Sequence, residues 1–114
     1  MNYKSYQKLL KNADSIPEEI YIEMIKYDVS LFCAIKKKNQ TEKLCIEAVK
    51  QNGHVLFYVR NQTEKICIEA VKKNGYCLQY VITQTPKICI EAVKTNKSIL
   101  KYIIPEFQHL FKGK

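Results

Sequence analysis

The sequence contains no tryptophan, a single arginine, three glycines and three prolines among 114 residues. One arginine leaves no arginine cluster for reading DNA bases. No apolar run approaches the roughly 18 residues that a membrane-spanning helix needs, so we expect no membrane segment. Lys4 and Lys8 interrupt the first residues, so we expect no secretory signal there. We therefore expect a cytoplasmic protein, or one of another reducing interior.

Residues that could catalyse a reaction are scarce. His54 and His109 lie in unrelated positions, and the adjacent acids Glu18 and Glu19 begin a predicted helix, where the helix dipole accounts for them. No CxxC pair or comparable Cys/His spacing indicates a metal site. We therefore expect no catalytic residue, no cofactor, no metal and no small-molecule substrate, and we predict that the protein is not an enzyme.

The chain does contain an internal repeat. Residues 40–61, 62–83 and 84–105 read QTEKLCIEAVKQNGHVLFYVRN, QTEKICIEAVKKNGYCLQYVIT and QTPKICIEAVKTNKSILKYIIP. A degenerate copy occupies 16–39, and 1–15 and 106–114 carry partial patterns, as the capping repeats of a solenoid do. We predict one domain, 1–114, made of an N-terminal cap, a degenerate repeat, three repeats and a C-terminal cap.

Each repeat predicts two helices. Threonine in the N-cap position precedes Glu or Pro, and apolar residues at i, i+1, i+4 and i+5 form one face. Gly53 and Gly75, each after an asparagine, predict the helix end with glycine in the left-handed conformation, which Lys97 adopts less easily. A shorter second helix follows. Because one hairpin cannot bury its own apolar face, we predict an all-α fold, a short α-solenoid of stacked 22-residue hairpins.

Three further positions recur in every repeat. Cysteine recurs within the apolar stripe, so we expect buried, reduced thiols at Cys45, Cys67 and Cys89. Glutamate recurs in mid-helix, within reach of lysines, at Glu47, Glu69 and Glu91. We expect these glutamates to pair with lysines of the same helix. The alternative is a ladder of acids that binds a basic peptide. Tyrosine recurs on the second helix, where packing is expected and base stacking is the alternative, at Tyr58, Tyr80 and Tyr102.

The repeat resembles a family of unknown function that is abundant in giant DNA viruses of amoebae and occurs in some bacteria. Its pattern is, in outline, Thr-x-x-Ile-Cys-x-x-Ala-Val-x-x-Asn-Gly-x-x-Leu-x-Tyr-Val. Residues 41–59 and 63–81 match this pattern closely, and residues 85–103 match it apart from the glycine. The resemblance implies a helical repeat fold and a viral or amoeba-associated origin. It implies no catalytic residue.

Three hypotheses about function stay open, and the third is a structural filler in a larger particle. The leading one is a non-enzymatic interaction module that binds a protein through residues that vary between repeats: His54, Phe57, Arg60, Tyr76, Gln79, Ile82 and Lys101. The alternative follows from the net charge of +8. It is a small basic protein that contacts nucleic-acid phosphates through Lys36, Lys37, Lys38, Lys50, Lys72, Lys73 and Lys94.

Apolar residues near the two ends predict self-association. An uncovered apolar end of a solenoid favours contact with another copy. We therefore expect a homo-oligomer that forms through Tyr6, Leu10, Phe107, Leu110 and Phe111.

Overall fold

The structure is a computed structural model that describes residues 2–12 and 15–111. All regular elements of this part are helices, and none of them is long and apolar enough to cross a membrane. The α-helices are α1 (Tyr3–Asn12), α2 (Glu18–Tyr27), α3 (Glu42–Gln51), α4 (Glu64–Lys73), α5 (Pro86–Thr95) and α6 (Pro105–Gln108). The 3₁₀ helices are η1 (Val29–Ala34), η2 (Lys37–Asn39), η3 (Gly53–Tyr58), η4 (Gly75–Tyr80), η5 (Lys97–Tyr102) and η6 (His109–Phe111).

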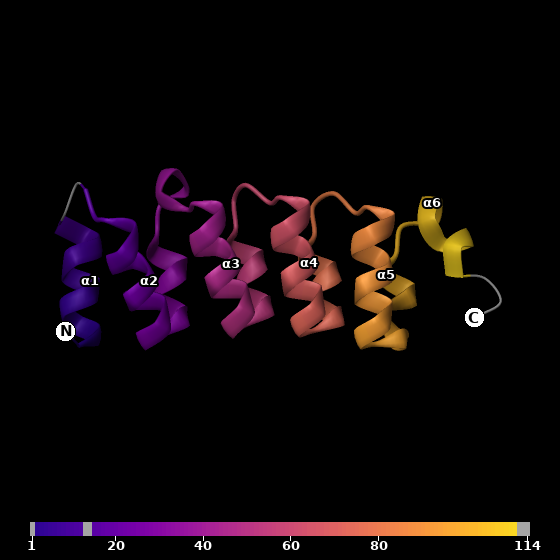
Figure 1. The fold of residues 1–114 in the computed structure, drawn as a ribbon, viewed down its shortest axis with the longest axis horizontal. Coiled ribbons are helices and arrows are strands. Elements are labelled where there is room, and N and C mark those ends of the chain that lie inside the picture. Colours follow the sequence, from indigo (N-terminus) through magenta and orange to yellow (C-terminus); the bar gives the residue numbers. More distant parts are fainter. Residues whose placement is uncertain (1, 13–14, 112–114) are drawn as a thin grey trace.

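The hairpins stack into a rod of 53 × 21 × 17 Å. Figure 1 shows α2 to α5 side by side in one row, each followed by a short helix that lies behind it. Behind them η1, η3, η4 and η5 form a second row, in which each helix packs against the next. α1 precedes α2 and runs in the opposite direction (Figure 1). The predicted all-α solenoid is confirmed, and its two rows of helices give the rod two different long faces.

Threonine caps the α-helix of each repeat and also joins the repeat to the preceding one. Its hydroxyl oxygen accepts a hydrogen bond of 3.2 Å from the backbone N–H three residues later, that of Leu44, Ile66 or Ile88. These bonds confirm the predicted threonine N-caps. The hydroxyl also donates to the glutamate that begins the preceding α-helix. These pairs are Thr41 with Glu18, Thr63 with Glu42 at 2.8 Å, and Thr85 with Glu64 at 2.6 Å.

The glutamine before each threonine makes a second tie between repeats, which the sequence pattern did not predict. The side-chain amide of Gln62 donates to the backbone carbonyls of Leu56 at 3.3 Å and Tyr80 at 2.9 Å. Its side-chain oxygen accepts from the backbone N–H of Ile82 at 2.9 Å and from the thiol of Cys67 at 3.5 Å. The bonds to the end of the same repeat recur at Gln40 and Gln84. Glutamine therefore fixes the backbone of the connecting segments.

The second helix of each repeat is a 3₁₀ helix of 6 residues, which the apolar pattern alone did not distinguish from an α-helix. At about three residues per turn, positions i and i+3 lie in one line, and Leu56 and Val59 are both buried. The side-chain oxygen of Asn52 begins this helix by accepting from the backbone N–H of His54 at 3.0 Å. The same cap recurs at Asn74 and Asn96.

The conformation predicted for glycine is wrong. The asparagines before Gly53 and Gly75 are extended, and both glycines lie outside the left-handed region. A Cβ on Gly53 would lie 2.8 Å from the carbonyl oxygen of Ala70, and one on Gly75 would lie 2.7 Å from that of Ala92. Glycine is therefore required because the α-helix of the next repeat approaches the backbone closely, and not because of the backbone angles.

The last repeat lacks two features that join the others to a following repeat. Pro86 replaces the glutamate that would receive the next threonine, and Lys97 replaces the glycine. Leu100 is 38% exposed, whereas Leu56 at the same position two repeats earlier is 0% exposed. The shorter α6 and η6 cover part of this end. These substitutions disfavour a further hairpin stacked on α5 in the same register.

The cysteines occupy the apolar core, as predicted for the repeated position. The four buried thiols are those of Cys45, Cys67, Cys77 and Cys89, and all five cysteines are free. Desolvation by burial raises the pKa of the Cys45, Cys67 and Cys77 thiols to about 11. Cys33 on η1 is exposed. The four buried thiols are therefore protonated at neutral pH and behave as small apolar side chains.

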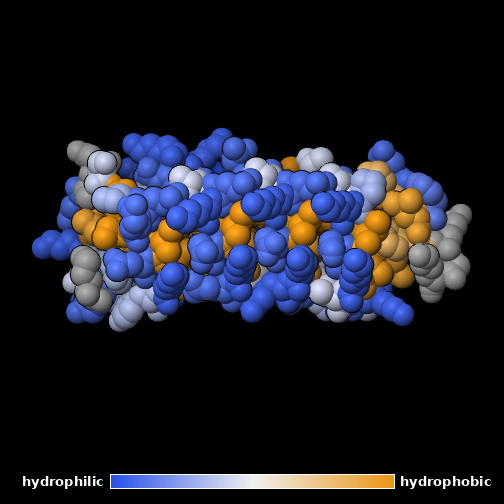
Figure 2. All heavy atoms as spheres, viewed as in Figure 1, coloured by the Kyte–Doolittle hydropathy of each residue, from blue (hydrophilic) through white to orange (hydrophobic). Residues whose placement is uncertain are grey.

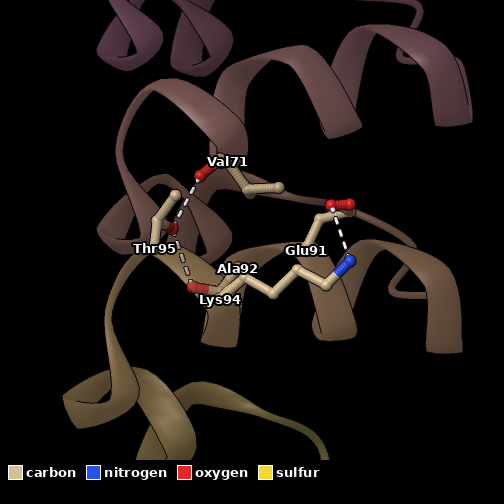
Figure 3. A network of polar contacts seen from close by, with 5 residues as sticks. All are labelled: Val71, Glu91, Ala92, Lys94 and Thr95. Carbon is tan, nitrogen blue, oxygen red and sulfur yellow. Dashed lines mark hydrogen bonds and ion pairs between the residues drawn. The ribbon is translucent and has the colours of Figure 1, made fainter.

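The predicted pairing of mid-helix glutamate with lysine occurs in one repeat of the described chain. The ammonium of Lys94 lies 3.6 Å from the carboxylate of Glu91 (Figure 3). The corresponding glutamates of α3 and α4 have no such partner among the described residues. Figure 3 also shows the Thr95 hydroxyl between the carbonyl oxygens of Val71 at 3.0 Å and Ala92 at 2.8 Å. This contact ties the end of α5 to α4.

Candidate interaction face

The seven residues predicted to bind a protein partner separate into two groups. Five lie on the row of η helices: His54, Phe57, Tyr76, Gln79 and Lys101. The other two, Arg60 and Ile82, lie on the segments that lead into α4 and α5. Tyr76 is half-buried and the other six are exposed. The structure therefore places these residues on the outside of the rod, but not on one continuous patch.

Phe57 forms the centre of the first group. Its side chain is 65% exposed, and its ring centroid lies 5.1 Å from that of Tyr58 and 5.7 Å from that of Tyr80, both edge to face. His54 also contacts Tyr80: the two ring centroids are 5.6 Å apart, and Nδ1 of His54 lies 3.2 Å from the Tyr80 hydroxyl. We call these four residues, His54, Phe57, Tyr58 and Tyr80, the Phe57 cluster. It spans two repeats, and its rings hold one another in place.

The face becomes more polar toward η5. The Tyr76 ring lies 6.2 Å from the Tyr102 ring, and its hydroxyl lies 2.8 Å from that of Ser98. The hydrogen bond with Ser98 lowers the pKa of Tyr76. The Lys101 ammonium lies 5.3 Å from the centroid of the Tyr102 ring, within cation–π range. Gln79 occupies the position that Phe57 has in the preceding repeat, so the exposed phenylalanine of η3 has no counterpart on η4.

Arg60 and Ile82 border a pocket of about 370 Å³ at the edge of the rod. Their backbone N–H groups are held by glutamine side chains, so the main chain is fixed while the side chains face outward. Ile82 is 74% exposed. Glu64 and three threonines supply polar groups to the lining. An exposed apolar side chain beside a cation and hydrogen-bonding groups has the mixed polarity of a protein interface.

Tyrosine contributes more to this face than its predicted packing role. Tyr80 and Tyr102 are half-buried against the core, as predicted, but Tyr58 is 40% exposed and contacts Phe57. The contact between Phe57 and Tyr80 joins residues 23 positions apart. Stacking repeats at a 22-residue period brings such pairs together. Comparing position i of one repeat with positions i+22 and i+23 could therefore have found the contact between Phe57 and Tyr80.

The lysines of the nucleic-acid hypothesis lie in two separate places. Three precede the N-terminal end of α3: Lys36, Lys37 and Lys38. Four lie in the last turns of the repeat helices, roughly 15 Å away along a ten-residue helix: Lys50, Lys72, Lys73 and Lys94. On the intervening α face, Figure 2 shows small hydrophobic patches between hydrophilic side chains. These lysines form two short basic strips and not one continuous path for a phosphate backbone.

The apolar ends are better covered than the sequence suggested. Tyr6 is buried, with its ring centroid 5.5 Å from that of Tyr27. Leu110 is 37% exposed, and Figure 2 shows a hydrophobic area near α6. The others are partly buried against the core: Leu10, Phe107 and Phe111. Self-association through these residues stays a prediction, with less apolar surface available than expected.

Neither histidine lies in a cluster with catalytic geometry. Nδ1 of His109 lies 3.1 Å from the carbonyl oxygen of Glu106 in its own short helix, and His54 belongs to the Phe57 cluster. Over residues 2–12 and 15–111, no group of three His, Cys, Asp or Glu side chains is placed to hold a metal. The expectation that the protein is not an enzyme stays a prediction.

Comparison with known proteins identifies one family. Two overlapping segments, residues 41–84 and 63–108, match the sequence model of a family described as Domain of unknown function (DUF4116). Together they span more than half of the chain, and each begins at a threonine N-cap and is at least two 22-residue periods long. No curated protein and no solved structure matches the chain. An origin in a giant DNA virus of amoebae, which the resemblance implies, stays a prediction.

Proposed function

The chain belongs to the family Domain of unknown function (DUF4116), and we propose that it is a non-enzymatic interaction module that binds a protein partner. The row of η helices is the binding face, and the Phe57 cluster is its anchor. The observation that carries the proposal is the exposed Phe57 side chain, ordered by contacts from two repeats.

Constant and variable positions of the repeat support this proposal. The residues that are the same in successive repeats hold the scaffold together. Threonine and glutamate join neighbouring α-helices, glutamine fixes the connecting segments, asparagine caps the η helices and glycine permits close stacking. The positions that vary on the second helix and after it are mostly exposed. A rigid scaffold with variable outward residues is how solenoid proteins generate specific binding surfaces.

The aromatic cluster has the chemistry of an interface anchor. Aromatic side chains are enriched among the few residues that dominate binding energy. Burying a phenylalanine completely is worth about 1.5–3 kcal/mol, and 65% of the Phe57 surface is still available for burial. Because Tyr58 and Tyr80 already restrict the Phe57 ring, little side-chain entropy is lost on binding.

Nucleic-acid binding is the alternative, and the surface supports it less. The lysines lie in two strips, and Lys94 is paired with Glu91. The rings of the Phe57 cluster contact one another edge to face, which leaves them less free to stack on bases. A partner of this class would bind in a strongly salt-dependent way. Salt dependence therefore distinguishes the two classes of partner.

The free thiols support a reducing compartment for this interaction. All five cysteines are unpaired, although Cys33 is exposed. Disulfides form in oxidising compartments and are rare in the cytosol. We therefore place the interaction in a reducing interior.

The test is a binding measurement with a variant that copies a neighbouring repeat. Phe57→Gln installs the residue that the next repeat has at this position, Gln79, so the fold already accepts it. Partners are captured from cells that naturally contain the protein, purified, and titrated against wild type and variant by calorimetry. Loss of an anchor residue costs about 2 kcal/mol or more, so we expect affinity to fall about 30-fold.

The matched control is Gln79→Lys, which copies Lys101 in the same way. It should change the affinity by less than about threefold, because neutral contacts surround an anchor. Equal affinities of wild type and Phe57→Gln would refute the proposal. So would a captured nucleic acid whose binding is lost when Lys72 and Lys73 are replaced by glutamate.

A further inference from the structure

A groove of about 760 Å³ separates α1 from η1 at the N-terminal end of the rod. Both walls are helical. The α1 wall consists of Tyr3, Gln7, Lys8, Leu10, Lys11 and Asn12, and the η1 wall consists of Ser30, Leu31, Cys33 and Ala34. The groove lies at the η1 end of the η row and its lining includes no residue of the Phe57 cluster, so it is a second candidate binding site.

The groove continues the row of η helices. Along this row η3 packs against both η1 and η4, whereas η1 has an η neighbour on one side only in the described chain. The surface of η1 that lines the groove also carries smaller side chains than the same positions of η3. Cys33 and Ala34 occupy the positions that Phe57 and Tyr58 have on η3. A short helix placed in the groove would therefore lie where another member of the row would be.

The charge of the lining selects the occupant. Lys8 and Lys11 face the groove, and the described residues that line it include no acid. The helix α1 itself carries lysine at three positions and no acidic residue. Leu10 and Ala34 supply apolar contacts beside the lysines. The complementary surface is one that combines carboxylates with apolar side chains.

We propose that this groove binds a short amphipathic helical segment of a partner protein whose acidic face pairs with Lys8 and Lys11. The apolar face of that segment packs on Leu10 and on the shallow wall formed by Cys33 and Ala34. A helix is favoured over an extended strand because the walls are two helices and offer no sheet edge. This site stands without the Phe57 cluster, so it can fail or succeed independently of the proposed function.

The experiment titrates the full chain into a fluorescent probe peptide and follows anisotropy. The probe is an N-acetylated helical peptide with leucine at i, i+3, i+4 and i+7 and glutamate on the opposite face. The comparison peptide has lysine in place of glutamate. We expect saturable binding of the acidic probe and at least tenfold weaker binding of the basic one.

Two charge-reversal variants locate the site. Lys8→Glu with Lys11→Glu should weaken binding of the acidic probe at least tenfold. Lys36→Glu with Lys37→Glu makes the same change in net charge at the start of η2, outside the groove lining, and should change the affinity less than threefold. Phe57→Gln should leave the affinity unchanged. Circular dichroism checks that all variants retain the helical content of the wild type.

Alkylation of wild-type protein provides a test without substitution. Iodoacetamide should modify Cys33, the exposed thiol, and the added group would occupy the groove. Intact mass should show one adduct, and probe affinity should fall at least fivefold. Equal loss in both charge-reversal variants would overturn the proposal, as would unchanged binding after alkylation. A single-stranded oligothymidylate that binds as tightly as the acidic peptide, with the same dependence on Lys8 and Lys11, would assign the groove to nucleic acid.

Discussion

The close stacking of repeats predicts a specific effect of adding one methyl group at Gly75. In Gly75→Ala the new Cβ would lie 2.7 Å from the carbonyl oxygen of Ala92 and 2.8 Å from the hydroxyl oxygen of Thr95. Both atoms belong to α5, and the carbonyl belongs to its backbone, so the helix must shift as a unit. Overpacking of this kind costs about 1–3 kcal/mol.

Alanine also has an opposing effect, because it restricts the unfolded chain. Where the native backbone accepts alanine without strain, replacing glycine stabilises a protein by about 0.4–1 kcal/mol. The clash outweighs this gain, since the contact distances at Gly75 are far below ordinary van der Waals contact. We therefore expect the free energy of unfolding to fall by about 1–1.5 kcal/mol, the balance of these two effects. Guanidinium unfolding followed by circular dichroism at about 222 nm measures this change.

Lys97 is the matched control, because it holds the same position in a repeat on which no further repeat helix is stacked. Lys97→Ala should change the free energy of unfolding by less than about 0.5 kcal/mol. Lys97→Gly should destabilise by roughly 0.5–1 kcal/mol through backbone entropy, whereas a left-handed backbone would make it stabilising. A neutral or stabilising Gly75→Ala would refute the account of stacking.

Three further predictions concern the core and the connections. In native protein at pH 8, a thiol reagent should label Cys33 within the time that leaves the four buried thiols unmodified, and unfolding should expose all five. Because burial raises the pKa of three buried thiols from 9.0 to about 11, the folded chain retains protons that the unfolded chain loses. The free energy of unfolding should therefore fall as pH rises from 9 to 11, which denaturant titrations at several pH values would detect. Gln62→Ala removes a side chain with four hydrogen-bond partners, so it should destabilise by about 2–3 kcal/mol, whereas Gln108→Ala, which loses one bond, should cost about 1 kcal/mol in the same assay.

The sequence was sufficient to predict the repeat architecture because the scaffold contacts are themselves repeated. Threonine N-caps, buried cysteines and a 22-residue period each recur three times, so local preference and stacking agree. The 3₁₀ form of the second helix was harder to predict, because its six residues present apolar pairs that also fit an α-helix. In the folded chain the 3₁₀ helix begins at the asparagine cap and places buried residues three positions apart on one side.

The role of glycine illustrates why local rules failed between repeats. Asn52-Gly53 has the local signature of a left-handed helix end, but the deciding contact comes from Ala70 in the next repeat. The Phe57 cluster has the same origin, since Tyr80 completes it from the following repeat. Arg60 and Ile82 lie on the outside of the rod, but beyond the ends of η3 and η4, because the connecting segments carry them. Contacts between neighbouring repeats therefore carry the information that a reading of single repeats omits.

Photo-cross-linking in cells that naturally contain the protein tests the central claim most directly. The photoreactive residue p-benzoylphenylalanine replaces Phe57 on the η row or, as a control, Ile90, which is 43% exposed on α5. Adducts are separated by mass and identified by mass spectrometry. If the η row binds a protein partner through the Phe57 cluster, position 57 should give a discrete protein adduct that position 90 does not give. Equal adducts from both positions, or adducts to nucleic acid alone, would contradict the account.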